Sequence, residues 1–99
     1  MITAIVLIHT DPGRTASAAE ALADIPDVAE VYSVTGEYDL VAVVRVKQYE
    51  QMAGVVPQQI ASTPGVARTH TLMAFRHYSR HDLEGLFTIG LETEPAPSG

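Results

Sequence analysis

The sequence predicts an α+β domain, a four-stranded antiparallel sheet with two helices on one face. Three observations predict it: an internal repeat, two strand-helix-strand units, and a hairpin that joins the units. Offsetting the sequence against itself by about 38 positions aligns Ala4 with Ala42, Val6 with Val44, Pro26 with Pro64 and Val28 with Val66. Two such units with right-handed crossovers give the ferredoxin-like order β-α-β-β-α-β.

The first unit begins with a strand at residues 2–10. Ile, Val and Leu occupy both alternating sets there, as in a central strand that is covered on both faces. Asp11 offers an N-cap carboxylate and Pro12 suits the first helical position, so we expect a helix from there to about Asp24. Pro26 ends this helix.

Two runs rich in β-branched residues, 28–34 and 40–46, predict the paired middle strands. Gly36 in their connection takes positive φ without steric cost, and Asp39 can fold its carboxylate onto nearby N–H groups. We therefore expect a rigid loop with inward-facing N–H donors that can hold a small polar ligand.

The second helix is predicted over residues 49–62, which keep one apolar face. Pro57 interrupts this stretch, because proline removes an i to i−4 hydrogen bond and clashes with the preceding turn. The sequence leaves two alternatives, a helix kinked at Pro57 or one that starts in earnest near Val56.

The last strand is predicted from Val66 to about Tyr78. Alternation places Thr69 and Thr71 on one face, with hydroxyls about 6 to 7 Å apart, a spacing that suits a ligand carboxylate or side chain. Threonine is also simply a good strand residue. His70 projects from the opposite face, where we expect an oligomer neighbour.

The 99 residues fit one domain. We assign residues 1–80 to a ligand-binding and oligomerisation domain, residues 81–91 to a short helical extension and residues 92–99 to a disordered tail. A domain of this size buries little surface, so an apolar sheet face is expected to be covered by self-association.

Composition excludes several classes of function. The chain has no cysteine, so thiolate nucleophiles, thiolate metal sites and disulfides are absent. Six basic residues against twelve acidic ones give a charge of −6, the wrong sign for direct nucleic-acid binding. The N-terminal apolar stretch is too short to span a membrane and lacks a basic leader, so we expect a soluble, cytoplasmic protein.

The motifs Val34-Thr35-Gly36-Glu37-Tyr38-Asp39-Leu40 and Pro64-Gly65-Val66-x-Arg68-Thr69-x-Thr71, with Ile25-Pro26-x-Val28, carry a family resemblance. They resemble the effector-binding domain of the Lrp/AsnC family of regulators, also called the RAM domain. The resemblance covers roughly residues 2–78 and is moderately specific when the motifs are taken together.

The resemblance implies a homodimer formed through the sheets, of the dimeric α/β-barrel type, rings of dimers, and an amino-acid effector bound where dimers meet. Gly36, Tyr38 and Asp39 would contact the ligand's α-amino and α-carboxylate groups, and Thr69 and Thr71 would line the same pocket. The helix-turn-helix of full-length regulators is missing, so we expect a stand-alone module that acts through a partner such as a full-length family member.

Two alternatives compete with this sensor hypothesis. One is a small monooxygenase or isomerase on the same scaffold, and the other is a dimerisation module without a ligand. The chain contains no asparagine and no Ser-His-Asp arrangement, so we predict a binding protein rather than an enzyme, without a cofactor. His77 and His81 are four apart, which suits a metal only on a helix, so we predict no metal site.

Overall fold

The computed structural model describes residues 1–80. Its elements are, in chain order, β1 (Ile2–Thr10), α1 (Thr15–Ala23), β2 (Val28–Ser33), β3 (Leu40–Val46), α2 (Tyr49–Gly54), the π-helix η1 (Val55–Ile60) and β4 (Val66–Ala74). The predicted order of strands and helices is confirmed. The helical extension and the tail predicted at 81–91 and 92–99 lie outside the described residues.

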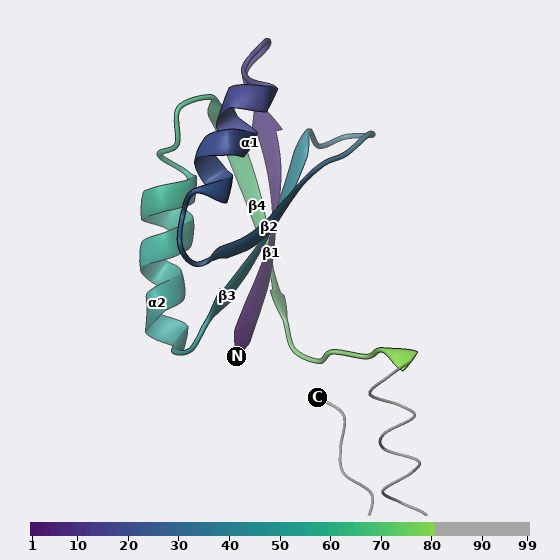
Figure 1. The fold of residues 1–99 in the computed structure, drawn as a ribbon, viewed down its shortest axis with the longest axis vertical. Coiled ribbons are helices and arrows are strands. Elements are labelled where there is room, and N and C mark those ends of the chain that lie inside the picture. The colour runs from purple at the N-terminus through teal and green to yellow at the C-terminus, as the bar shows by residue number, and fades with distance from the viewer. Residues whose placement is uncertain (81–99) are drawn as a thin grey trace, which may run out of the picture.

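The strands form one antiparallel sheet in the order β2-β3-β1-β4. Helix α1 and the continuous α2–η1 helix lie on the same side of this sheet, and no helix or strand of residues 1–80 covers the other side, called the open face below (Figure 1). This is the predicted ferredoxin-like arrangement. Among the described residues, no helix has the length and apolar character needed to cross a membrane.

The core lies between the sheet and the helices. Its buried apolar residues are Ala4, Val6, Ile8, Ala18, Leu22, Val28, Leu40, Ala42, Val44, Val46, Met52, Val55 and Ile60. Even-numbered positions of β1 and β3 supply most of the strand contribution, because alternate side chains of a strand point to one face. Burial of each Leu or Ile side chain contributes about 1.5 to 3 kcal/mol to the free energy of folding. The packing of this layer fixes the strands that carry the site described below.

The start of α1 differs from the prediction. Asp11, Pro12 and Gly13 form a tight turn, in which the Arg14 N–H donates to the Asp11 carbonyl at 3.0 Å and Gly13 has a φ of 75°. Proline followed by glycine at the two central positions favours a type II turn. The helix begins only at Thr15 and has no side-chain cap hydrogen bond, so the predicted Asp11 N-cap is wrong.

The second helix accommodates Pro57 by widening. It begins at Tyr49, as the sequence predicts, so the alternative start near Val56 is wrong. From Val55 the coil is a π-helix, in which the Ala61 N–H donates to the Val56 carbonyl at 3.0 Å, five residues back. Such π-turns are rare and occur mostly as single turns within α-helices.

The loop before β4 is held against the start of α1. A Cβ added at Gly65 would lie 3.0 Å from the Cβ of Arg14 and 3.3 Å from the Cβ of Ala18, and the φ of Gly65 is 93°. The Asp11 N–H donates to the Gly65 carbonyl at 2.9 Å. Only glycine fits this conformation and this close approach without strain.

Candidate ligand-binding site

The connection between β2 and β3 carries three of the five predicted ligand-binding residues, Gly36, Tyr38 and Asp39. The Val34 N–H donates to the Asp39 carbonyl at 3.0 Å and closes the loop. Gly36 has a φ of 108°, which a residue without Cβ adopts easily. The loop extends beyond the sheet, on the side away from α2 (Figure 1). The predicted hairpin connection between the two middle strands is confirmed, and Gly36 within it is exposed.

The Asp39 carboxylate is bound to β1. Its Oδ2 accepts a hydrogen bond from the Thr10 N–H at 2.8 Å, and the Asp39 N–H donates to the Ile8 carbonyl at 2.9 Å. A hydrogen bond to a charged acceptor contributes roughly 1.5 to 3 kcal/mol. The carboxylate therefore bonds a residue 29 positions away in sequence and holds the hairpin on the sheet, instead of folding onto an N–H group near Asp39 in the sequence.

Sequence reasoning missed the partners of this loop. The rings of His9 and Tyr38 lie with their centroids 4.6 Å apart at an interplanar angle of 38°. The hydroxyl oxygens of Thr10 and Thr15 are 2.7 Å apart, which joins the end of β1 to the first residue of α1. Strand alternation could have placed His9 on the open face, but no local pattern pairs it with a hairpin residue.

Thr69 and Thr71 lie on β4, on the helix-covered side of the sheet. They are paired with Ile8 and Val6 of β1, both of which are fully buried in the core. Thr69 is half-buried and Thr71 is exposed. Thr71 lines a groove of about 450 Å³ between β4 and α2–η1. Apolar side chains that include Met52, Val56 and Pro57 form much of its wall.

The structure thus divides the five predicted residues into two groups. Asp39 bonds to the Ile8 carbonyl from the β3 side, whereas Thr69 is paired with Ile8 from the β4 side. Strands that flank a common neighbour are about 9 to 10 Å apart. Within one chain, the central strand therefore lies between the hairpin residues and the two threonines.

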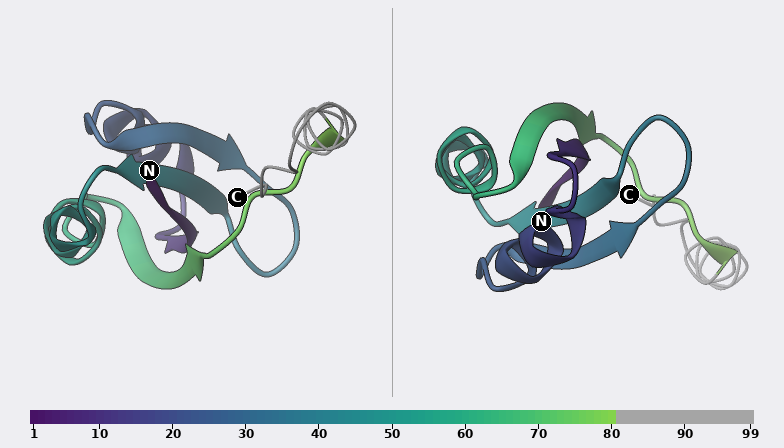
Figure 2. Two further views of the ribbon diagram at one scale, coloured as in Figure 1. Left: turned by 90° about the horizontal axis from the view of Figure 1, so that it is seen from below. Right: turned by 90° about the horizontal axis from the view of Figure 1, so that it is seen from above.

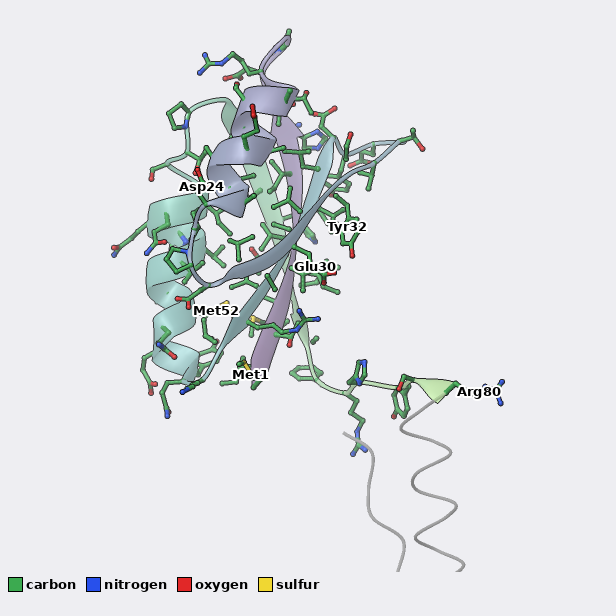
Figure 3. The ribbon with its side chains drawn as sticks, in the orientation of Figure 1. Met1, Asp24, Glu30, Tyr32, Met52 and Arg80 are labelled. Carbon is green, nitrogen blue, oxygen red and sulfur yellow. The ribbon has the colours of Figure 1, made fainter. Side chains whose placement is uncertain are left out.

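A second polar cluster lies on the open face. The Tyr32 hydroxyl donates to Glu30 Oε2 at 2.6 Å, and Arg45 lies 3.6 Å from Glu30 Oε1. The hydrogen bond to Glu30, and then the negative charge of Glu30, raise the pKa of Tyr32 above its ordinary value of 10.0. Figure 3 shows Glu30 and Tyr32 on the side of the sheet opposite Met52 of α2.

Metal ligation has no support in the described part of the chain. Residues 1–80 contain no group of three His, Cys, Asp or Glu side chains placed to hold a metal ion. His81, one half of the His77–His81 pattern, lies outside these residues.

The four-stranded antiparallel sheet with two helices on one side defines a small ferredoxin-like domain. The family model of the Lrp/AsnC ligand binding domain matches residues 3–83. The chain belongs to this family.

Known relatives agree with this assignment. The chain is 36% identical over 73 residues to the HTH-type transcriptional regulator FL11 of Pyrococcus horikoshii, covering 74% of this chain and 48% of the regulator. It therefore spans about half the length of the curated relatives that it matches.

Solved structures include relatives of similar extent. TTHA0845 from Thermus thermophilus is 57% identical with a TM-score of 0.75, covering 81% of this chain and all of that one. The transcriptional regulator NMB0573 from Neisseria meningitidis, solved as an L-Met complex, shares the fold with a TM-score of 0.71 at 15% identity, covering 80% of this chain and 53% of that one.

Proposed function

We propose that this chain is an amino-acid-sensing module that assembles through its open sheet face and regulates through a protein partner. The observation that carries the proposal is the hairpin, which is fastened to the central strand by Asp39 in a domain of the Lrp/AsnC ligand-binding family. The L-Met complex of the Neisseria meningitidis regulator is a precedent for an amino acid bound by a protein that contains this fold.

The hairpin supplies groups that match the two ends of an amino acid. Asp39 would accept hydrogen bonds from the α-ammonium group, because a carboxylate held in place by Thr10 loses little entropy on binding. The exposed backbone at Gly36 would meet the α-carboxylate, because glycine carries no side chain and a Cβ added there would lie in open space. Tyr38, whose ring packs at a tilt against that of His9, would close the pocket from the side.

Assembly would complete the pocket. Because β1 separates the hairpin from Thr69 and Thr71, one ligand would meet both groups only where two protomers adjoin. A ring of dimers with the effector between dimers satisfies this requirement.

The open sheet face is the surface we assign to the dimer. Ile5 and Leu7 are only half-buried there, and Tyr32 and Leu72 are 49% and 45% exposed. An apolar patch of this kind marks an interaction surface on a small domain.

Regulation is proposed to run through a partner such as a full-length family member in the cytoplasm, without direct contact to nucleic acid or membrane. The charge of −6 opposes binding to phosphate backbones. We propose no catalytic role, and turnover of a substrate by the purified chain would overturn this part.

The test is a thermal-shift screen of the twenty amino acids at millimolar concentration, combined with measurement of the assembly's mass. A ligand that binds the native state raises the melting temperature by mass action. We expect at least one amino acid to shift the melting temperature or the mass. A full panel that moves neither quantity would contradict effector binding.

The dimer face has its own test. Leu72→Asp places a charge on the open face and is expected to dissociate the dimer, because an unpaired buried charge is costly. Ala21→Asp, at an exposed position of α1, is the matched control. A Leu72→Asp variant that keeps the parent mass would refute the proposed face.

A further inference from the structure

The open face carries a groove at the end where β1 begins and β4 ends. Its volume is about 530 Å³, and Ile5, Val43 and Phe75 supply apolar surface to it. Arg45 and Arg76 add two guanidinium groups to the same lining. The groove therefore combines an apolar surface with positive charge.

Phe75 is a large apolar side chain of this groove that is left exposed to solvent. It follows β4 directly and is 94% exposed. Large aromatic side chains usually bury most of their surface, and an exposed one beside other apolar residues marks a contact surface.

The chain leaves the domain from this groove. Residues 75–77 contribute to the groove, and residues 78–80 run away from the body of the domain, on the side opposite α2 (Figures 1 and 2). Residues 78–80 thus point toward the side on which a second copy would lie against the open face.

The sequence of this segment complements the groove. Between residues 82 and 94 the apolar residues are Leu83, Leu86, Phe87, Ile89 and Leu91, and the acidic ones are Asp82, Glu84, Glu92 and Glu94. Residues 81–99 contain neither lysine nor arginine. Apolar groups matched to an apolar surface, and carboxylates matched to guanidinium groups, favour this pairing.

We infer that residues 82–94 of one protomer dock in this groove of a second copy, so that the two protomers exchange their C-terminal segments. The inference rests on the proposed open-face dimer. A second copy is favoured over the segment's own domain because the chain runs outward from its own groove. In a two-fold dimer both exchanges form at once, and a short connection gives the segment a high effective concentration.

Disulfide trapping tests this exchange cleanly, because the chain has no cysteine of its own. We would mix the full-length single variants Ala74→Cys, in the groove, and Leu86→Cys, in the segment, and oxidise them. The expected product is an interchain disulfide between positions 74 and 86, identified by the mass of the linked peptides. Ala21→Cys on α1 replaces Ala74→Cys in the control mixture and should give no such product above background.

A double variant with both cysteines distinguishes exchange from docking within one chain. Exchange yields a product of two chains on a non-reducing gel, whereas a product of one chain overturns the inference. Absence of any link between positions 74 and 86 also overturns it.

A dissociation measurement separates this inference from the proposed function. The double substitution Leu86→Asp with Phe87→Asp should raise the dimer dissociation constant at least tenfold. It should leave the circular dichroism spectrum, and so the fold, unchanged. An unchanged constant refutes the exchange and leaves the open-face dimer standing. A parent chain that is monomeric at all concentrations refutes the dimer itself.

Discussion

Replacement of Asp39 separates the structural role of its carboxylate from its proposed role toward a ligand. Asp39→Ala removes the acceptor of the Thr10 N–H at 2.8 Å and leaves this partly buried donor without a partner. Such a loss costs about 1 to 3 kcal/mol. For a domain of this size, each kcal/mol corresponds to about 4 to 8 °C in melting temperature. We therefore expect a decrease of about 4 to 24 °C.

Asp39→Asn is the sharper variant, because its side-chain oxygen still accepts from Thr10 while the negative charge is gone. We expect its stability to lie between those of the parent and the alanine variant. Its response to the effector should be lost, because an amide attracts a ligand ammonium group far less than a carboxylate does.

The matched control is Glu37→Gln, which removes one charge from the same loop at an exposed position. It should change neither the melting temperature nor the ligand-induced shift. All variants are compared at one protein concentration by thermal and urea unfolding, with and without the effector found in the screen. An alanine variant as stable as the parent would refute the fastening role of Asp39, and an asparagine variant that keeps the full shift would refute the charge requirement.

Two further predictions concern the loops and the open face. Gly65→Ala should destabilise the fold more than Gly36→Ala. Both residues have positive φ, but only a Cβ at Gly65 meets neighbours at 3.0 to 3.3 Å. Equal losses in the free energy of unfolding, measured in urea, would contradict this. In a spectrophotometric pH titration of the tyrosines, Glu30→Gln should lower the pKa of Tyr32 toward 10.0, because the native pKa is raised by the Glu30 hydrogen bond and charge. Since the native state holds this proton more tightly, the associated stability is present below pH 10.0 and is lost as the pH rises through the raised pKa; an unchanged titration would refute the assignment.

The sequence was sufficient for the fold because its signals are local and repeated. The β-branched runs, the helical apolar faces and the internal repeat all agree on one topology, which is the consistency expected of a sequence that specifies a single structure. Two predicted boundaries are wrong. The last strand ends at Ala74 and not near Tyr78. The start of α1 was misplaced because Asp11-Pro12-Gly13 satisfies the rules for both a helix start and a tight turn. The positive φ of Gly13 decides between them.

The candidate site was less predictable because its decisive contacts are non-local. The pairing of Asp39 with Thr10 and that of Tyr38 with His9 depend on β1 lying beside β3, which no spacing within the hairpin encodes. The separation of Thr69 from the hairpin likewise follows from the strand order rather than from the motif that contains it.

The π-turn at residues 55–60 has a consequence for changes in chain length. In a coil with five-residue hydrogen bonds, Val55 and Ile60 lie nearly above one another, and both are buried. The π-turn therefore contains one residue more than a regular α-helix needs to connect the same two points. Deletion of Pro57 would let this turn become an ordinary α-helical turn. In a family member one residue shorter here, β4 could therefore still begin at the same place.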